Sequence, residues 1–484
     1  GSDLRVEYTA MGDAMNLAAR MESAAQPGTV LVAEDTHRLV APLFQTEALG
    51  TIHVKGKAEP VPVFRVLAAK ALPAKPRGIA GLASPLVGRE AEFGALLEAV
   101  ERLQAGTGGI VTLVGEAGIG KSRLVAELRD GIDATHPRWV ESLCLSYGGS
   151  IAYLWWLDVL RGVLGVGVED APRTVRETLR DAVRSLCPDR FDDVYPFLGR
   201  MLSLPLEENV SAALDDLEGE QLKTRTFAAV ETMLTCAAED RPLVLVCEDL
   251  HWADPTSLEL LENLLPLVDH IPLLFLCVFR PERDHGCWRI RETASREHSH
   301  CHTDLSLHAL STAESETLVG NLLRMEHLPQ PLQDRILSHA EGNPFYLEEV
   351  LRSLIDSGAI AQDEATGRWH ATRDVADIAI PDSLQGVLMA RIDRLQAQTR
   401  RVLQMASVIG RTFLHRVLAA IAREERGLEA KLLTLQQEEL ISERARLPEL
   451  EYIFKHHLTQ EAAYNGLLKA ERRASHRQVG EALE

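Results

Sequence analysis

The sequence is short of positive charge and of paired cysteines. It has 51 Lys and Arg against 71 Asp and Glu, which gives a formal net charge of −20. A large nucleic-acid interface needs an excess of basic side chains to neutralise phosphates, so we expect no nucleic-acid partner. The seven cysteines are scattered singly, without a C-x-x-C pair. This pattern predicts reduced thiols in a cytoplasmic protein.

Long apolar runs are also missing. The longest candidate, residues 151–168, is interrupted by Asp158 and Arg161. A membrane-spanning helix needs roughly 18 apolar residues, so we expect no membrane partner, and no secretory signal peptide opens the chain. The length of 484 residues predicts about three domains. Because the chain starts at Gly1 and stops at Glu484 within a helical pattern, we expect it to be a piece of a longer protein.

A phosphate-binding loop is the most specific feature of the sequence. Residues 109–114 form an apolar run rich in β-branched side chains, and G-x-x-x-x-G-K-S follows, ahead of a helical pattern. Glycines in such a turn let main-chain N–H groups point at a polyphosphate. Lys121 would reach the β- and γ-phosphates of ATP or ADP, and Ser122 would ligate Mg²⁺. The predicted contacts in the loop are Gly115, Gly118, Gly120, Lys121 and Ser122.

A second apolar run, residues 243–247, ends in two carboxylates, Glu248 and Asp249. Such a run predicts a buried parallel strand that delivers acids to its C-terminal edge. One acid would hold Mg²⁺ and the other would orient the attacking water. We assign Glu248 to the metal and Asp249 to the water, and the opposite assignment stays open. Asp254 is expected to cap the following helix.

Two further groups complete the predicted nucleotide site. Arg280 follows the apolar run 273–279, and a cation at the tip of a neighbouring parallel strand can sense the γ-phosphate. The alternative is an ordinary surface arginine after a strand. Val87 and Gly88, just before an amphipathic helical pattern, are predicted to contact the nucleotide.

Together with E-D-L-H-W-A-D-P at residues 248–255, these features resemble the STAND class of AAA-type signalling ATPases, in the branch often fused to cyclases. The resemblance extends from about residue 85 to residue 484. It implies an α/β P-loop NTPase with a parallel sheet, followed by a helical lid and a winged helix. The implied boundaries are 85–310 for the nucleotide-binding domain, 311–380 for the lid, 381–457 for the winged helix and 458–484 for the start of a TPR-like helical repeat region.

The same resemblance implies two more nucleotide contacts. In G-N-P-F at residues 342–345, Pro344 would pack near the adenine, and the same residues also suit a helix C-cap glycine followed by a first-turn proline. In F-K-H at residues 454–456, His456 would face the phosphates of bound ADP. A lone histidine is more often structural.

A winged helix often binds DNA, but the charge of this segment argues against that role. The helix expected over residues 428–440 carries Glu429, Glu438 and Glu439 against a single Lys431, and these acids would face phosphates. We therefore expect this segment to pack against the nucleotide-binding domain. Protein partners would bind through the helical repeats.

The residues Y-T-A-M-G-D-A-M-N-L-A-A-R at 8–20 and V-K-G-K at 54–57 resemble the C-terminal part of class III nucleotide cyclases. The resemblance implies an α+β cyclase fragment over residues 1–70, joined by a linker at 71–84, and a cyclase partner subunit in a dimer. It also implies that Thr9 contacts the purine, Asn16 and Arg20 stabilise the transition state, and Lys55 binds the triphosphate. Asn16 and Arg20 are four residues apart, so one helix face presents both.

The metal-binding aspartates and the purine-selecting lysine of that family would lie before Gly1. Without those carboxylates no two-metal site can activate the attacking hydroxyl. We therefore expect cyclase activity only from a longer protein.

Residues 285–302 are rich in histidine and cysteine. None of their spacings matches a zinc motif, so we predict a polar loop before a strand at 304–307. The side chains concerned are His285, Cys287, His298, His300, Cys301 and His302.

The sequence thus predicts an ATP-binding and ATP-hydrolysing switch that regulates an attached nucleotide cyclase. One alternative is a cyclase whose ATPase part is an inert tether. Another is a STAND-type transcription regulator whose DNA-binding domain lies outside this chain.

Overall fold

The computed structural model describes most of the chain from residue 84 onward and a smaller part before it. The described residues are 21, 25, 29–33, 36–37, 44–52, 61–69, 84–132, 137–144, 152–167, 170–282, 285–323, 330–362, 369–372, 383–422, 427–445 and 450–483. The chain divides into two compact units, Gly1–Arg77 and Gly78–Glu484. Among the helices described, none is long and apolar enough to cross a membrane.

The N-terminal unit holds a three-stranded antiparallel sheet with the order β1-β3-β2. Its strands are β1 (Val30–Ala33), β2 (Phe44–Ile52) and β3 (Val61–Ala69). The apolar runs 51–54 and 61–67 predict a hairpin. Strands β2 and β3 form it, but β2 starts at Phe44, well before residue 51. Strand β2 does not alternate regularly between apolar and polar residues. It pairs with β3 through two register shifts, one of them near Gly50 (φ 87°). The predicted cyclase residues Thr9, Asn16, Arg20 and Lys55 lie outside the described residues.

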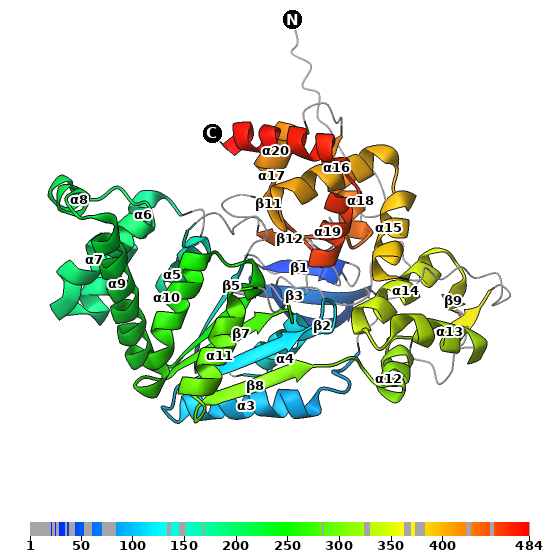
Figure 1. The fold of residues 1–484 in the computed structure, drawn as a ribbon. Helices are drawn as coiled ribbons and strands as arrows, with labels where there is room; N and C mark the ends of the chain where they lie inside the picture. The colour runs from blue at the N-terminus through cyan, green and yellow to red at the C-terminus, as the bar shows by residue number, and fades with distance from the viewer. Residues whose placement is uncertain are drawn as a thin grey trace, which may run out of the picture. The chain divides into compact units, whose positions relative to one another are not determined.

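The second unit is built on a sheet of five parallel strands in the order β5-β6-β7-β4-β8. The strands are β4 (Gly109–Gly115), β5 (Arg138–Leu143), β6 (Leu243–Glu248), β7 (Leu273–Phe279) and β8 (His302–Leu307). Every residue of β4, β6 and β7 is buried, as the continuous apolar runs predict. Strand β7 lies between the phosphate-loop strand β4 and the acidic strand β6, as the ribbon in Figure 1 shows.

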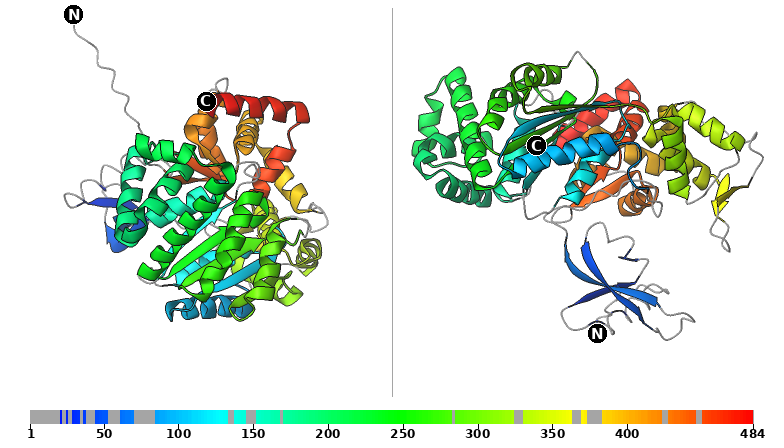
Figure 2. Two further views of the ribbon diagram at one scale, coloured as in Figure 1. Left: turned by 60° about the vertical axis from the view of Figure 1, so that its left-hand side comes forward. Right: turned by 90° about the horizontal axis from the view of Figure 1, so that it is seen from below.

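Helices cover both faces of this sheet because alternate strand residues point to opposite sides. Val111 and Leu113 of β4 pack with α3 (Glu90–Gln104) and α4 (Lys121–Gly131). Ile110 and Val114 belong to the larger core on the other face. The helices of that core are α5 (Leu154–Leu164), α6 (Pro172–Leu186), α7 (Phe191–Met201), α8 (Glu208–Asp215), α9 (Gly219–Asp240), α10 (Pro255–Leu264) and α11 (Cys287–Glu297). Figures 1 and 2 show α6 to α9 gathered as a helical lobe beside α5 and α10.

Helix α11 corrects one prediction. Residues 287–297 were expected to form a polar loop, yet they are helical, with Cys287, Ile290 and Ala294 buried against the sheet. The period of these apolar positions matches one helix face, and the neighbouring histidines and cysteines obscured it. The expected strand after it is β8.

Three helices follow the sheet: α12 (Thr312–Leu323), α13 (Gln330–Ala340) and α14 (Pro344–Asp356). The residues S-T-A-E at 311–314 predict a capping box. It is present at the start of α12, where the Ser311 amide donates to the Glu314 carboxylate at 2.6 Å. Residues 359–372 predict a hairpin, and β9 (Ile360–Gln362) pairs with β10 (Trp369–Ala371).

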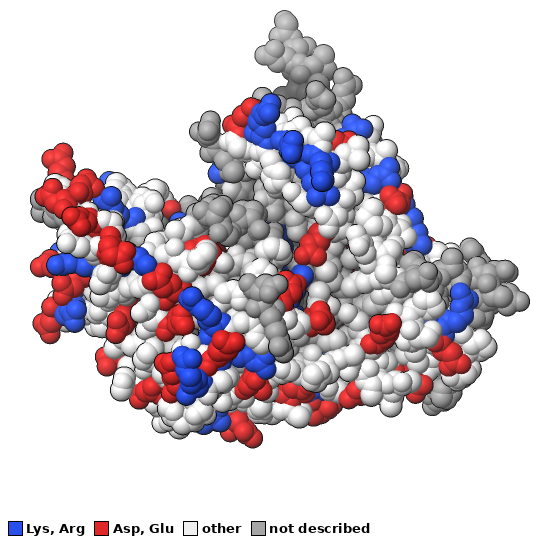
Figure 3. All heavy atoms as spheres, viewed as in Figure 1, with Lys and Arg blue, Asp and Glu red and all other residues white. Residues whose placement is uncertain are grey.

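The remaining elements, residues 383–483, are here called the C-terminal module. Its helices are α15 (Leu384–Arg394), α16 (Ala397–Ile409), α17 (His415–Ile421), α18 (Leu428–Gln437), α19 (His457–Asn465) and α20 (Lys469–Leu483). Its strands β11 (Thr412–Leu414), β12 (Ile441–Ala445) and β13 (Glu451–Phe454) form an antiparallel sheet ordered β11-β13-β12. Figure 3 shows Lys and Arg side chains gathered over α20.

The module corrects two helix boundaries. The apolar spacing of residues 413–422 predicts a helix that starts at Phe413. The helix begins instead at His415, because Phe413 lies in β11, which pairs with β13. The helix predicted to reach residue 440 ends at Gln437, and Glu439 adopts a left-handed conformation (φ 54°) before β12. In both places a long-range strand pairing overrides the local helical pattern.

Candidate functional site

The phosphate loop joins the end of β4 to the start of α4. Gly118 (φ 80°) and Gly120 (φ 104°) both adopt left-handed conformations, which glycine tolerates best. A Cβ at Gly120 would meet no atom within 4 Å, so its conformation alone calls for glycine. A Cβ at Gly118 would come within 2.9 Å of the Asn343 side chain, so this glycine also allows close packing.

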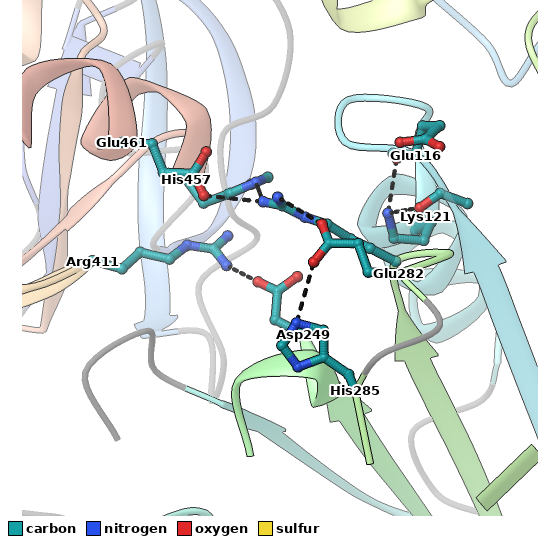
Figure 4. A network of polar contacts seen from close by, with 10 residues as sticks. Glu116, Lys121, Asp249, Glu282, His285, Arg411, His457 and Glu461 are labelled. Atoms are coloured by element: carbon teal, nitrogen blue, oxygen red, sulfur yellow. Dashed lines mark hydrogen bonds and ion pairs between the residues drawn. The ribbon is translucent and has the colours of Figure 1, made fainter. Parts of the chain in front are cut away.

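Lys121 is buried at the base of this loop, with 8% of its surface exposed. Its Nζ donates to the carbonyl oxygens of Gly115 at 2.6 Å and Glu116 at 2.9 Å (Figure 4). The pKa of Lys121 is lowered to about 8, mainly by burial and also by the nearby charge of Arg280, whereas Asp249 and other nearby acids oppose the shift. A desolvated ammonium in a glycine-rich turn at a helix N-terminus fits a polyphosphate ligand.

The two predicted acids lie beside this lysine. Glu248 is the last residue of β6 and is 1% exposed, and Asp249 follows in a left-handed conformation (φ 55°). Both carboxylates favour the charged form of Lys121, so strand β6 delivers them to the phosphate loop as predicted. The Asp249 carboxylate accepts a hydrogen bond from an Arg411 guanidinium N–H at 2.8 Å. Figure 4 shows Arg411 reaching Asp249 from the C-terminal module.

Arg280 follows β7, also at this edge of the sheet, and only 13% of its side chain is exposed. Its guanidinium donates to Glu461 of α19 at 3.2 Å and contacts the His457 ring nitrogen. Asp249 and Arg280 are therefore both bound by residues more than a hundred positions later in the chain. The sequence did not predict that Arg411, His457 and Glu461 belong to this site. Only His457 had a sequence feature that pointed to the site, its position directly after F-K-H.

His251 was also missed, although it lies within E-D-L-H-W-A-D. It is 3% exposed, and burial lowers its pKa to about 3, with the positive charges of Arg280 and Lys121 adding to the effect and Asp249 opposing it. Burial likewise holds the pKa of His457 well below its usual range, helped by Arg411 and Arg280. Two neutral imidazoles therefore lie close to the phosphate loop.

The G-N-P-F turn contacts the phosphate loop directly. Asn343 caps α14 by accepting from the amides of Phe345 and Tyr346, and its side-chain amide donates to the Ala117 carbonyl at 3.0 Å. The Phe345 amide donates to the Gly118 carbonyl at 3.3 Å. Pro344 is thus held next to the loop, and the His456 ring lies 4.1 Å from the Phe345 ring, centroid to centroid.

His456 and His457 therefore have different surroundings. His457 contacts Arg280, whereas the ring of His456 lies against that of Phe345. A contact between His456 and phosphates stays a prediction.

Val87 and Gly88 lead into Arg89, a buried residue that ties this segment to the site. The Arg89 guanidinium donates to the carbonyls of His308 at 2.6 Å and Ile119 at 3.4 Å. Gly88 adopts φ 64°, and a Cβ there would come within 2.4 Å of the Glu314 carboxylate. The segment thus packs between the phosphate loop and the start of α12.

Comparison with known protein families matches three segments of the chain. Residues 85–279 match the family described as AAA ATPase domain, and residues 2–66 match the adenylate and guanylate cyclase catalytic domain. Residues 311–368 match a domain of unknown function. The chain is therefore similar to an AAA ATPase domain that follows cyclase catalytic-domain sequence, and the predicted resemblance to such a fusion is confirmed.

Two curated relatives align along most of the chain. An uncharacterized protein of Rhizobium meliloti is 25% identical over 97% of this chain and 44% of its own length. Mouse adenylate cyclase type 10 is 20% identical over 87% of this chain and 28% of its own length. The chain thus spans less than half the length of each.

Two solved structures resemble parts of the fold. A STAND protein with a tetratricopeptide repeat sensor from Pyrococcus horikoshii aligns with a TM-score of 0.43 and 13% identity, covering 82% of this chain and 45% of that one. The ORC2 protein of Aeropyrum pernix, in ADPNP and ADP complexes, aligns with a TM-score of 0.35 and 14% identity. The alignment covers 85% of this chain and 97% of that one.

Proposed function

We propose that this chain is an ATP-controlled switch of the STAND class, in which the C-terminal module regulates access to the catalytic residues. One observation carries the proposal: the two groups predicted to handle the γ-phosphate and the attacking water, Arg280 and Asp249, are both bound by that module. While the C-terminal module binds Arg280 and Asp249, these side chains are not available to contact a phosphate or a water molecule. Rearrangement of the module would therefore be coupled to catalysis.

The phosphate loop would bind ATP or ADP through its main-chain N–H groups and Lys121. Ser122 and Glu248 would hold Mg²⁺, and a bound Mg²⁺ would neutralise negative charge on the phosphates. Asp249 would orient water, and Arg280 would bind the γ-phosphate. Val87, Gly88 and Pro344 would enclose the nucleotide, and His456 would reach its phosphates in the ADP state.

The switch follows from competition for Arg280. In this structure its guanidinium is paired with Glu461, in surroundings that are largely buried. A γ-phosphate at the same strand edge would offer a stronger anion, whereas ADP would not. A ligand can shift a conformational equilibrium only through such a difference in binding between the two states. ATP would thus release the C-terminal module, and hydrolysis would restore it.

We propose a nucleotide-binding domain over 85–310, a helical lid over 311–380 and a winged helix over 381–457. From residue 458 a TPR-like repeat region would begin, offering a surface for protein partners. The winged helix would act as a packing module, because Lys431 of α18 is 8% exposed and Glu439 bonds to Lys455 at 2.9 Å.

The output would be cyclic nucleotide synthesis in a longer protein. The motivation is the cyclase sequence in the same chain, with a linker predicted over 71–84, and a dimeric cyclase would supply its partner subunit. In a longer form with cyclase activity, Lys121→Ala is expected to change cyclic-nucleotide output. Unchanged output would instead favour an inert ATPase tether.

ATP binding and turnover test the central proposal. The purified chain is expected to retain nucleotide and to hydrolyse Mg²⁺-ATP slowly, and Lys121→Ala should abolish both. Lys469→Ala, which removes an exposed lysine from α20, serves as the matched control and should behave as wild type. Equal turnover by the wild type and Lys121→Ala would refute the assignment.

A further inference from the structure

A cluster of metal-ligating side chains lies outside the nucleotide site. Asp269, at the end of the 3₁₀ helix Leu265–Asp269, meets His298, which follows α11, and Cys301, just before β8. His298 Nδ1 is 3.1 Å from one Asp269 carboxylate oxygen, and Cys301 Sγ is 3.8 Å from the other. One potential ligand atom from each of the three residues lies within 4.8 Å of the others.

These distances suit a tetrahedral ion. Bonds of about 2.0–2.3 Å place the donor atoms of a tetrahedral zinc shell about 3.3–3.7 Å apart. The separations of 3.1 Å from His298 and 3.8 Å from Cys301 are to different oxygens of the Asp269 carboxylate, and a set with one donor atom from each residue lies within 4.8 Å. Imidazole, thiolate and carboxylate together are donors that favour zinc over Mg²⁺ or Ca²⁺. Only small side-chain movements would be needed to close the shell.

The cluster is held rigidly by the sheet. His298 is 5% exposed, and the Cys301 amide donates to the His298 carbonyl at 3.0 Å, so the two donors share one tight turn. The Cys301 carbonyl accepts from Ile110 of β4 at 3.0 Å. Because β4 begins at Gly109 and the phosphate loop follows its other end, the cluster lies at the opposite edge of the sheet from the nucleotide site.

His300 supports the same carboxylate from outside. Its Nε2 lies 2.7 Å from an Asp269 oxygen, and 65% of its side chain is exposed. A partner of this kind orients a metal-binding carboxylate without contacting the ion. The short linear spacing of the histidines and cysteines matches no zinc motif because the third ligand, Asp269, comes 29 residues before His298.

We propose that Asp269, His298 and Cys301 form a binding site for a zinc-class divalent ion, which fastens the starts of β4, β7 and β8 together. The fourth position is a water. Since the ligand is the thiolate, binding displaces the proton of the Cys301 thiol.

Cobalt substitution tests the proposal on the full chain, stripped with a chelator and kept free of nucleotide. Titration with Co²⁺ is expected to reach one equivalent and to produce a near-ultraviolet thiolate-to-cobalt absorption, which one equivalent of Zn²⁺ removes. Cys301→Ser should abolish that absorption and weaken Zn²⁺ binding by roughly 100-fold or more. Any Co²⁺ at the phosphate loop would have oxygen ligands only and would give no thiolate absorption.

Two controls make the outcome decisive. Cys236→Ser removes a half-buried thiol of α9 and should leave the absorption intact. His300→Asn should keep the absorption, with weaker binding. Zn²⁺ should raise the Tm of the wild type but not that of Cys301→Ser. Absence of the absorption in the wild type, or its persistence in Cys301→Ser, would show that the cluster is only a hydrogen-bonded group of side chains.

Discussion

Single residues around the phosphate loop carry pKa values far from their usual ones. Lys121 has a pKa of about 8 without nucleotide, because burial disfavours its charged form. A bound polyphosphate would raise that pKa, so binding takes up a proton wherever the free lysine is neutral. The pH dependence of nucleotide binding therefore reports on this residue.

We predict that ATP affinity is constant below about pH 8 and falls above it, by up to about tenfold per pH unit. Calorimetric titration between pH 7 and pH 9.5, in two buffers of different ionisation enthalpy, would measure both Kd and the proton uptake. Lys121→Arg is the control, since its guanidinium stays charged and the pH dependence should vanish. A flat profile for the wild type would contradict the prediction.

His251 makes the stability of the folded chain sensitive to acid. Its pKa is about 3 in the folded state, against an ordinary value of 6.5, so the unfolded state binds more protons between these values. Stability is therefore lost as the pH falls below 6.5, by up to about 1.4 kcal/mol per pH unit from this residue. His457 acts in the same direction.

His251→Phe is expected to reduce this acid sensitivity, whatever its effect on stability at pH 7. Urea unfolding of the two proteins at pH 7, 6 and 5 would measure the slopes. Identical slopes would mean that other groups account for the loss. His308→Asn, which alters an exposed histidine, should leave the slope unchanged.

At the scale of elements, the start of α14 connects the proposed lid to the phosphate loop. Asn343 both caps this helix and donates to Ala117 of the loop. We predict that Asn343→Ala lowers the free energy of unfolding by about 1–2 kcal/mol and also weakens nucleotide binding, because the loop loses a tether.

Ser383→Ala provides a matched comparison for this prediction. Ser383 caps α15 through the amide of Gly386 at 3.1 Å, in a different part of the chain. It should show a similar loss of helix capping without a change in nucleotide affinity. If both variants affected nucleotide binding equally, the loop contact of Asn343 would have no separate role.

At the scale of the whole ATPase unit, buried charges connect the proposed lid to the C-terminal module. Glu349 of α14 forms an ion pair with Arg391 of α15. Arg352 pairs with Glu439, which Lys455 also contacts. Burial raises the pKa of the adjacent Glu348 and lowers that of Lys455. Burying such ion pairs removes their hydration, and separating the partners would leave uncompensated buried charges. The proposed lid and the C-terminal module are therefore expected to move together.

Because Arg411 binds Asp249, we predict that this contact lowers the rate of ATP hydrolysis. Arg411→Gln should release Asp249 and raise the ATP turnover of the full chain by roughly tenfold. Loss of a contact worth about 1.4 kcal/mol changes the ratio of restrained to released molecules by that factor. Steady-state hydrolysis of Mg²⁺-ATP would measure it. Arg400→Gln, which breaks the exposed pair with Asp393 in the same module, should have no effect. Unchanged or lower turnover in Arg411→Gln would argue against restraint.

The sequence by itself determined the parts that depend on local spacing. The phosphate loop, the buried parallel strands, the capping box at Ser311 and the cap at Asp254 involve residues within a few positions of one another, where backbone geometry follows directly from side-chain type. Parallel strands also bring their C-terminal ends to one edge, so the grouping of Lys121 with Glu248 was predictable.

Only the tertiary structure decided which residues meet across long stretches of chain. Arg411 contacts Asp249 over 162 positions, and Arg280 contacts His457 over 177. Strand β11 exists because Phe413 pairs opposite Tyr452, although its local pattern is helical. The group of Asp269, His298 and Cys301 likewise depends on how α11 returns to the sheet. Such contacts arise from the packing of whole elements, and no local sequence pattern encodes them.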